Sequence, residues 1–130
     1  MKDRLKVLVV EDEKISQQVI ISMLVDKYDC YVDLAKNATE AFDLIHYEAF
    51  EWNTDGYDLI FMAIGLPDIN GDELTNVLRQ TEAKNAPIIA VTSNIDDNKK
   101  KILLSSGFTD VMEKPVTEAK IDNIFKLYLS

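Results

Sequence analysis

Acidic, hydroxyl and basic side chains follow separate apolar segments of this sequence, and together they could hold a metal ion beside a phosphate-like anion. Glu11-Asp12-Glu13 follows the first apolar segment, Thr92-Ser93 follows a later one, and Lys114 comes near the C-terminus. Neighbouring carboxylates suit a hard divalent cation. A lysine beside a hydroxyl suits an anionic group. If the fold brings these residues together, the pocket would suit a divalent cation and a phosphoryl oxyanion.

Five short segments have the composition of β-strands. Residues 7–10, 59–62 and 88–91 are continuous apolar runs rich in branched side chains. Runs of this kind are typical of strands buried on both faces of a parallel sheet. Residues 31–35 and 109–113 are weaker strand candidates. The sequence therefore predicts a sheet with three central and two flanking strands.

Segments with helical periodicity separate these strands, and a further one closes the chain. Asn37 followed by Glu40 resembles a capping box, Thr117 can cap the last helix, and Gly107 can end the helix around residues 99–105. Strands that alternate with helices predict an α/β fold, with a doubly wound parallel sheet and right-handed crossovers. We expect residues 1–130 to form a single domain.

Ligands of such a sheet bind beyond the carboxyl ends of the strands, where the strand order changes direction. The residues that follow the predicted strands should therefore converge on one crevice. They include the acidic, hydroxyl and basic groups above, together with Ala63, Gly65 and Pro67 after the central run.

Four motifs carry a family resemblance. They are VVED at 9–12, FMAIGLPDING at 61–71, AVTS at 90–93 and KP at 114–115. In this order and at these strand ends, they resemble the response-regulator receiver domain of two-component signalling over about residues 5–129. The GLPD stretch is similar to receivers embedded in hybrid sensor kinases. The resemblance implies a flavodoxin-like (βα)5 fold with strand order 2-1-3-4-5.

The resemblance also implies roles for individual residues in the crevice. Asp12 corresponds to the carboxylate that binds Mg²⁺ directly, Glu11 to its neighbour acting through water, and Gly65 to a backbone carbonyl ligand. Thr92 corresponds to the hydroxyl that moves toward the phosphoryl group, and Lys114 to the cation that pairs with it.

Further positions correspond to the loops and the switch of the family. Pro67 and Gly71 belong to the loop after the central strand, and Pro115, preceded by a cis bond in the family, would aim the lysine. Many receivers carry an aromatic switch residue three positions before the lysine, but here that residue is Val111. The switch would then involve a smaller rearrangement of residues 94–107, or a neighbour such as Phe108.

Ala63 stands where the family has its phosphate-accepting aspartate. A methyl group cannot attack a phosphohistidine or ligate Mg²⁺, so we expect no phosphotransfer and weak Mg²⁺ binding. Asp58 precedes the strand and Asp68 lies past the turn, so neither is expected to replace the missing acceptor. Without that carboxylate, Lys114 should be free to lean toward Asp12.

Two functions remain open. The first is a phosphorelay receiver that accepts a phosphoryl group when residue 63 is aspartate. The second is a pseudo-receiver that binds partners without phosphorylation. We favour an aspartate substituted by alanine over a naturally degenerate site, because the other pocket residues all match the family. A flavodoxin-type nucleotide carrier is disfavoured, because Glu11-Asp12-Glu13 has the wrong charge to cradle a phosphate.

Charge and composition limit the classes of partner that this chain is expected to bind. With 14 basic and 23 acidic residues, the net charge of −9 opposes direct nucleic-acid binding. Residues 59–67 are too short to span a membrane, and we expect a cytoplasmic protein. The resemblance implies a histidine kinase or histidine phosphotransfer protein as donor and a separate output domain or protein, with no enzymatic activity of its own. Lys99-Lys100-Lys101 is a local basic patch, interpreted as a solvated helix face or a docking surface.

Overall fold

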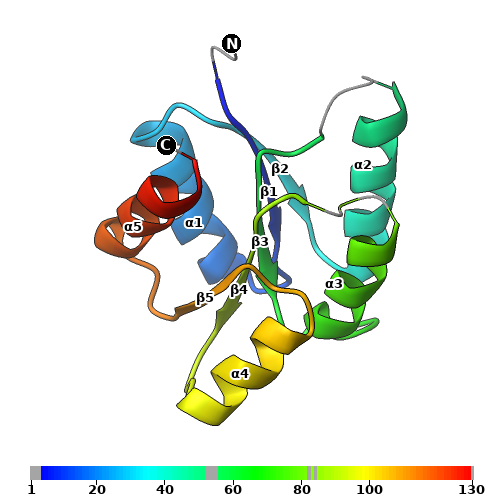
Figure 1. The fold of residues 1–130 in the computed structure, drawn as a ribbon. Coiled ribbons are helices and arrows are strands. Elements are labelled where there is room, and N and C mark those ends of the chain that lie inside the picture. Colours follow the sequence, from blue (N-terminus) through cyan, green and yellow to red (C-terminus); the bar gives the residue numbers. More distant parts are fainter. Residues whose placement is uncertain (1–3, 52–55, 82, 84, 130) are drawn as a thin grey trace.

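A five-stranded parallel sheet forms the centre of the molecule in the computed structural model, which describes residues 4–51, 56–81, 83 and 85–129 (Figure 1). The strands are β1 (Lys6–Val10), β2 (Tyr31–Ala35), β3 (Leu59–Ala63), β4 (Ile88–Thr92) and β5 (Asp110–Glu113). The helices are α1 (Lys14–Asp26), α2 (Ala38–Glu51), α3 (Gly71–Gln80), α4 (Asp97–Ser105) and α5 (Glu118–Tyr128).

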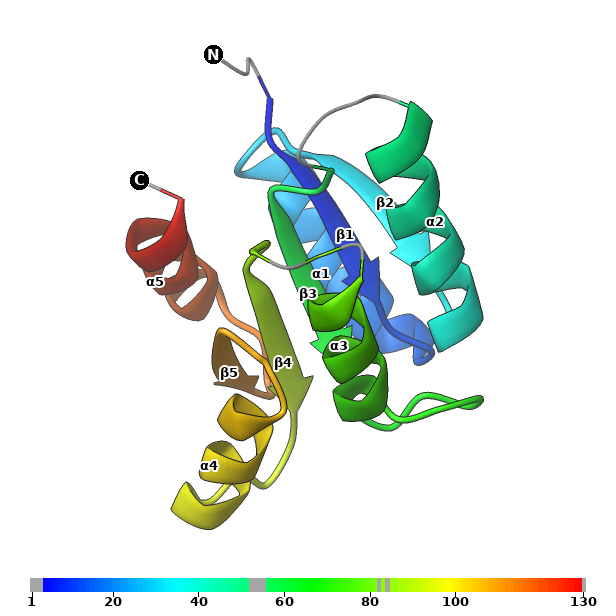
Figure 2. The same ribbon diagram turned by 45° about the vertical axis from the view of Figure 1, so that its right-hand side comes forward.

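The strand order is β2-β1-β3-β4-β5 and every pairing is parallel, which confirms the predicted fold. Helices α1 and α5 cover one face of the sheet, and α2, α3 and α4 lie on the other (Figures 1 and 2). Because all strands run the same way, their carboxyl ends share one edge. Chain segments that are far apart in sequence therefore meet at that edge.

Alternate residues of each central strand enter different cores. In β1, Val7 and Val9 pack with Ile20 of α1 and Ile121 of α5. Leu8 and Val10 pack on the opposite face with α2, α3 and α4. β1, β3 and β4 are buried on both faces, which explains their continuous apolar sequences. The loops at the carboxyl edge therefore start from strands that are packed on both faces.

The predicted capping residues take part in the helix starts. The Asn37 side chain accepts a hydrogen bond from the Glu40 N–H at 2.8 Å, and the Glu40 carboxylate accepts one from the Lys36 N–H at 3.0 Å. Thr117 accepts from the Lys120 N–H at 3.2 Å, as predicted for the last helix.

Five element boundaries differ from the sequence prediction by one or two residues: β1 begins at Lys6, β3 ends at Ala63, β4 ends at Thr92, β5 begins at Asp110 and α4 begins at Asp97. The early start of α4 follows from Asp96, whose carboxylate accepts a hydrogen bond from the Lys99 N–H at 2.7 Å and so caps the helix.

Arg79 at the end of α3 ties two loops together. Its guanidinium donates hydrogen bonds to the carbonyls of Ala83 (2.8 Å), Ala86 (2.6 Å) and Gly107 (2.8 Å), and to the Thr109 hydroxyl (3.0 Å). Desolvation lowers the pKa of Arg79. The side chain thus fixes the loop before β4 and the turn after α4.

The connection at residues 49–56 was expected to be a surface loop or a helix extension. Its first part is helical, because α2 continues to Glu51, and Trp52 lies outside the described residues. None of the helices in the described ranges has the length and hydropathy of a transmembrane span.

Candidate functional site

A polar crevice of about 310 Å³ opens at the carboxyl edge of the sheet, where β1, β3, β4 and β5 end. Its lining residues are Glu11, Asp12, Glu13, Ala63, Ile64, Gly65, Val91, Thr92, Ser93 and Lys114. The fold therefore brings together the predicted acidic pair, hydroxyl, lysine and residue 63. Pro67, Gly71, Val111 and Pro115 are not part of this lining.

An ion pair between buried Glu11 and partly exposed Lys114 joins opposite sides of the crevice. The Glu11 side chain is only 3% exposed, and its Oε1 lies 3.2 Å from Lys114 Nζ. Its Oε2 accepts a hydrogen bond from the Glu13 N–H at 3.1 Å. The prediction that Lys114 would lean toward Asp12 is wrong. Asp12 is exposed, whereas a buried carboxylate needs a compensating charge, and Glu11 is the buried one.

The residues around this crevice only partly suit a magnesium ion. Asp12 is an exposed carboxylate, and residue 63 offers only a methyl group. Glu11 Oε2 accepts a hydrogen bond from the Glu13 N–H, whereas its Oε1 lies at ion-pair distance from Lys114 without a hydrogen bond. In the described part of the chain, no cluster of three or more acidic, histidine or cysteine side chains is placed to hold a metal. Mg²⁺ is usually held by one or two carboxylates together with several waters in octahedral geometry, and the methyl group of Ala63 supplies no ligand to such a set.

Ala63 is the last residue of β3 and is 6% exposed at the base of the crevice. The loop that follows closes tightly, because the Gly71 N–H donates a hydrogen bond to the Ile64 carbonyl at 2.7 Å. A side chain at Gly71 would overlap the Ala63 carbonyl oxygen. Glycine is therefore needed there for close approach. Pro67 is exposed on the same loop, and the Lys114-Pro115 bond is cis, as expected from the resemblance.

Neither nearby aspartate reaches the crevice. Asp58 precedes β3, and its carboxylate accepts a hydrogen bond from the Lys6 N–H at 2.8 Å, at the opposite end of the sheet. Asp68 turns away to the start of α2, where it accepts hydrogen bonds from the backbone of Ala38 (2.8 Å) and from Thr39. These hydrogen bonds hold the pKa of Asp68 well below its usual range, and the bond from the Ala38 N–H makes the largest contribution. Both carboxylates therefore hydrogen-bond to backbone groups outside the crevice.

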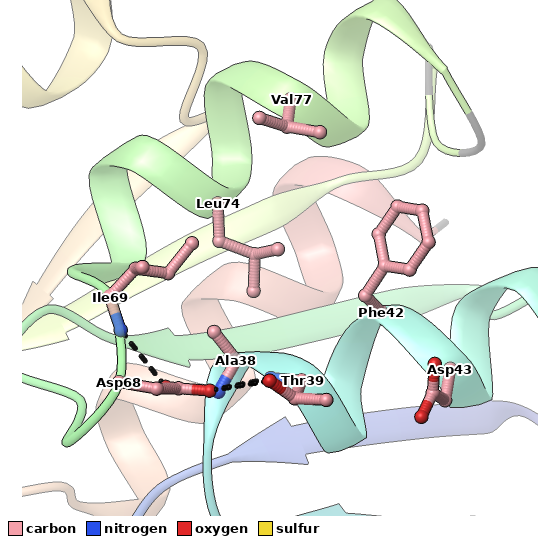
Figure 3. Close-up of a pocket in the computed structure, with 8 residues that line it drawn as sticks. All are labelled: Ala38, Thr39, Phe42, Asp43, Asp68, Ile69, Leu74 and Val77. Carbon is pink, nitrogen blue, oxygen red and sulfur yellow. Dashed lines mark hydrogen bonds between the residues drawn. The ribbon is translucent and has the colours of Figure 1, made fainter.

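Asp68 instead borders a second, apolar pocket of about 270 Å³ between α2 and α3. Figure 3 shows the apolar side chains of Phe42, Leu74 and Val77 around this pocket and the hydrogen bonds of Asp68 at one end. The pocket lies apart from the polar crevice and shares no lining residue with it.

Lys99 reaches the crevice although the sequence did not single it out for this role. Its Nζ lies 3.3 Å from Thr92 Oγ1 and 3.4 Å from the Ser93 carbonyl oxygen. The first lysine of the basic run is therefore half-buried over the end of β4. The local signal was the capping residue Asp96, whose carboxylate accepts a hydrogen bond from the Lys99 N–H and starts the helix two residues before the expected position.

Val111 occupies the position of the aromatic switch residue in many receivers. It is half-buried against the core formed with α2, α3 and α4, and Phe108 is buried in the same core. No ring stands at position 111, so any switch in this chain works without the rotation of an aromatic side chain there.

Comparison with known proteins identifies the fold and its family. Residues 7–126 match the response regulator receiver domain. This chain belongs to the receiver domain family. Receiver domains act in two-component phosphorelays and typically bind Mg²⁺. The position of the crevice at the carboxyl edge of the sheet is therefore consistent with membership of this family.

Among characterised proteins, this receiver domain is 34% identical over 124 residues to transcription factor prr1 of Schizosaccharomyces pombe. The match covers 95% of this chain and 21% of that protein, so the chain spans about a fifth of its relative's length.

Solved structures with the same fold include two informative neighbours. One is the co-crystal structure of the Saccharomyces cerevisiae phosphotransfer protein Ypd1 with the receiver domain of Ssk1, which matches at 29% identity and a TM-score of 0.79, covering 96% of this chain and 88% of that one. The other is the receiver domain of the Pseudomonas aeruginosa sensor kinase PA1611, at 26% identity and a TM-score of 0.78, covering 96% and 97%. That structure holds a magnesium ion in its active-site cleft.

Proposed function

We propose that this receiver domain docks with a phosphohistidine donor but cannot accept its phosphoryl group. One observation carries the proposal: Ala63 lies at the base of a crevice that retains the acidic pair, Thr92 and Lys114. An aspartate at position 63 would place a carboxylate among these groups. The domain is a signalling module and not an enzyme, and we place it in the cytoplasm with its phosphorelay partners.

Restoring aspartate tests the chemistry directly. Ala63→Asp should incorporate acid-labile phosphate from acetyl phosphate in the presence of Mg²⁺, because the carboxylate can attack phosphorus. The unchanged chain and Ala63→Asn should both stay unlabelled, and the asparagine variant controls for the size and polarity of the new side chain. Labelling of the unchanged chain would show another acceptor and overturn the proposal.

Weak Mg²⁺ binding is a second part of the proposal. Loss of even an indirect partner of a metal ligand weakens binding about 10- to 100-fold, so loss of a direct carboxylate ligand should weaken it at least as much. Calorimetric titration should show that Ala63→Asp binds Mg²⁺ at least about tenfold more tightly than the unchanged chain. Dissociation constants that are equal for the two proteins would contradict this.

The donor surface is expected beside the crevice, at the start of α1. Ile15 is 72% exposed and Val19, one turn further, is 37% exposed, and both follow directly after the acidic loop. The co-crystal structure of a related receiver with Ypd1 supports a phosphotransfer protein as partner. With Ypd1 as the probe, Ile15→Asp should weaken binding, whereas Val25→Asp, on another face of the same helix, should not. Equal binding by both variants would exclude this surface.

A pseudo-receiver that binds partners without phosphorylation is the alternative function. The Glu11–Lys114 ion pair favours it, because the lysine has a partner in the absence of any phosphoryl group. The two functions predict different results for Ala63→Asp. A receiver becomes labelled, whereas a pseudo-receiver stays unlabelled and binds its partner with unchanged affinity.

A further inference from the structure

Lys99 differs from the two lysines that follow it in α4. Lys100 and Lys101 are exposed, whereas Lys99 is half-buried. Asp96 holds the Lys99 N–H at 2.7 Å, which fixes the first turn of α4 against the loop after β4. From this position the Lys99 side chain turns back toward the crevice, and its Nζ lies 3.3 Å from Thr92 Oγ1.

This contact determines how the Thr92 hydroxyl can be used. A lysine ammonium only donates hydrogen bonds, whereas a hydroxyl both donates and accepts. Lys99 therefore makes the Thr92 oxygen an acceptor and leaves its proton for another acceptor. At present that acceptor is the Ser93 carbonyl at a long distance of 3.4 Å, so an anionic oxygen in the crevice could readily replace it.

The charges around the crevice also leave a role for a second cation. Three carboxylates, Glu11, Asp12 and Glu13, line it, and the one lysine in the lining is paired with Glu11. Among the described residues, Lys99 makes no ion pair within salt-bridge distance, and its charge lies next to Thr92. An anionic group entering the crevice would meet this charge through the threonine hydroxyl.

We propose that Lys99 is a positioning residue of the crevice, which holds the Thr92 hydroxyl so that its proton points to an incoming phosphoryl oxygen. This inference rests on the proposed function and adds a residue to its site. In Ala63→Asp, a carboxylate oxygen forms the new bond to phosphorus while the bond from phosphorus to acetate breaks, and acetate leaves with the electron pair. Lys99 and Thr92 stabilise charge on the transferred group and exchange no atoms with it.

A double-mutant cycle in the Ala63→Asp background tests this role. Lys99→Met should slow labelling by acetyl phosphate about three- to tenfold, the effect of losing one long hydrogen bond from a half-buried ammonium group. Lys99→Arg should retain most of the rate. Lys100→Met, which removes the same charge one residue away, should label at the rate of the parent. In a Thr92→Ala background, Lys99→Met should have little further effect, because Lys99 acts through the hydroxyl.

The cycle also defines the results that would overturn the inference. An unchanged labelling rate in Lys99→Met would do so. An equal loss in the presence and absence of the Thr92 hydroxyl would show instead that Lys99 acts through its general charge, and would also overturn the positioning role.

A measurement on the unchanged Ala63 chain separates this inference from the proposed function. In ¹⁵N–¹H correlation spectra, Lys99→Met should shift the backbone amides of Thr92 and Ser93, and Lys100→Met should not. If Ala63→Asp is never labelled, the proposed function fails and the phosphoryl role of Lys99 fails with it. The spectra would still show whether Lys99 contacts Thr92. Amides of Thr92 and Ser93 that do not respond to Lys99→Met would overturn the contact itself.

Discussion

The Glu11–Lys114 pair makes a quantitative prediction about stability. Lys114→Met removes the ammonium group but keeps much of the apolar stem, so it leaves the Glu11 carboxylate buried without its partner. The Glu11 side chain is 3% exposed and that of Lys114 is 29% exposed. The carboxylate therefore cannot regain full hydration without movement of the loop that carries it. We expect a large loss of folding stability.

Two limits define the size of this loss. At the observed 3.2 Å, the Coulomb attraction is about 5 kcal/mol with an effective dielectric constant near 20, and partial exposure of the lysine reduces it. Removal of one partner from a fully buried ion pair typically costs about 3–5 kcal/mol, and the partial exposure of Lys114 places this pair below that range. We therefore expect Lys114→Met to lower the free energy of unfolding by about 2–3 kcal/mol.

Urea denaturation at neutral pH measures this difference. Lys101→Met is the matched control, because it removes the same charge from an exposed side chain and should change stability by less than about 0.5 kcal/mol. The double variant Glu11→Gln/Lys114→Met should recover at least half of the loss, since no buried charge remains. A Lys114→Met variant as stable as Lys101→Met would refute the reasoning, and so would a double variant that recovers nothing.

Three further predictions concern side chains outside the crevice. Arg79→Met should lower the free energy of unfolding by about 2–4 kcal/mol in urea, because three backbone carbonyls and the Thr109 hydroxyl lose their donor. The lowered pKa of Asp68 means that its carboxylate stabilises the fold above about pH 4, and that this stabilisation is lost as the pH falls further. Asp68→Asn should therefore be less stable at neutral pH and show a weaker acid dependence of its urea midpoint. The hydrogen bond from Tyr128 to Asp110, at 2.7 Å, raises the pKa of Tyr128 to about 12. The stabilisation is complete below about pH 10 and lost toward pH 12, so Tyr128→Phe should flatten the alkaline decline in melting temperature.

Most of the fold could be predicted from local patterns. Strands buried on both faces have continuous apolar sequences, and β1, β3 and β4 are buried in this way. Capping residues such as Asn37 and Thr117 act within a few residues of the helices they start. These signals are local in sequence, which is why they could be interpreted without coordinates.

The convergence of the crevice residues followed from topology, but their pairing did not. The parallel strand order places Glu11, Asp12 and Lys114 at one edge, as predicted, and says nothing about which carboxylate is buried. Burial of Glu11 rather than Asp12 decided the partner of the lysine. Lys99 was missed for a similar reason, because its contact with Thr92 depends on the angle at which the first turn of α4 leaves the sheet.

The proposed function implies that this receiver loses its chemistry at residue 63 while its shape is kept. The backbone of Ala63 pairs with Val91 in the sheet, and its carbonyl packs against Gly71; neither contact depends on the side chain. The charge that a side chain at this position would share with Lys114 is supplied by Glu11. An aspartate-to-alanine change therefore removes the nucleophile and leaves the exposed start of α1 in place. Partner binding and phosphoryl acceptance should be separable properties of this domain, and comparison of the unchanged chain with Ala63→Asp separates them experimentally.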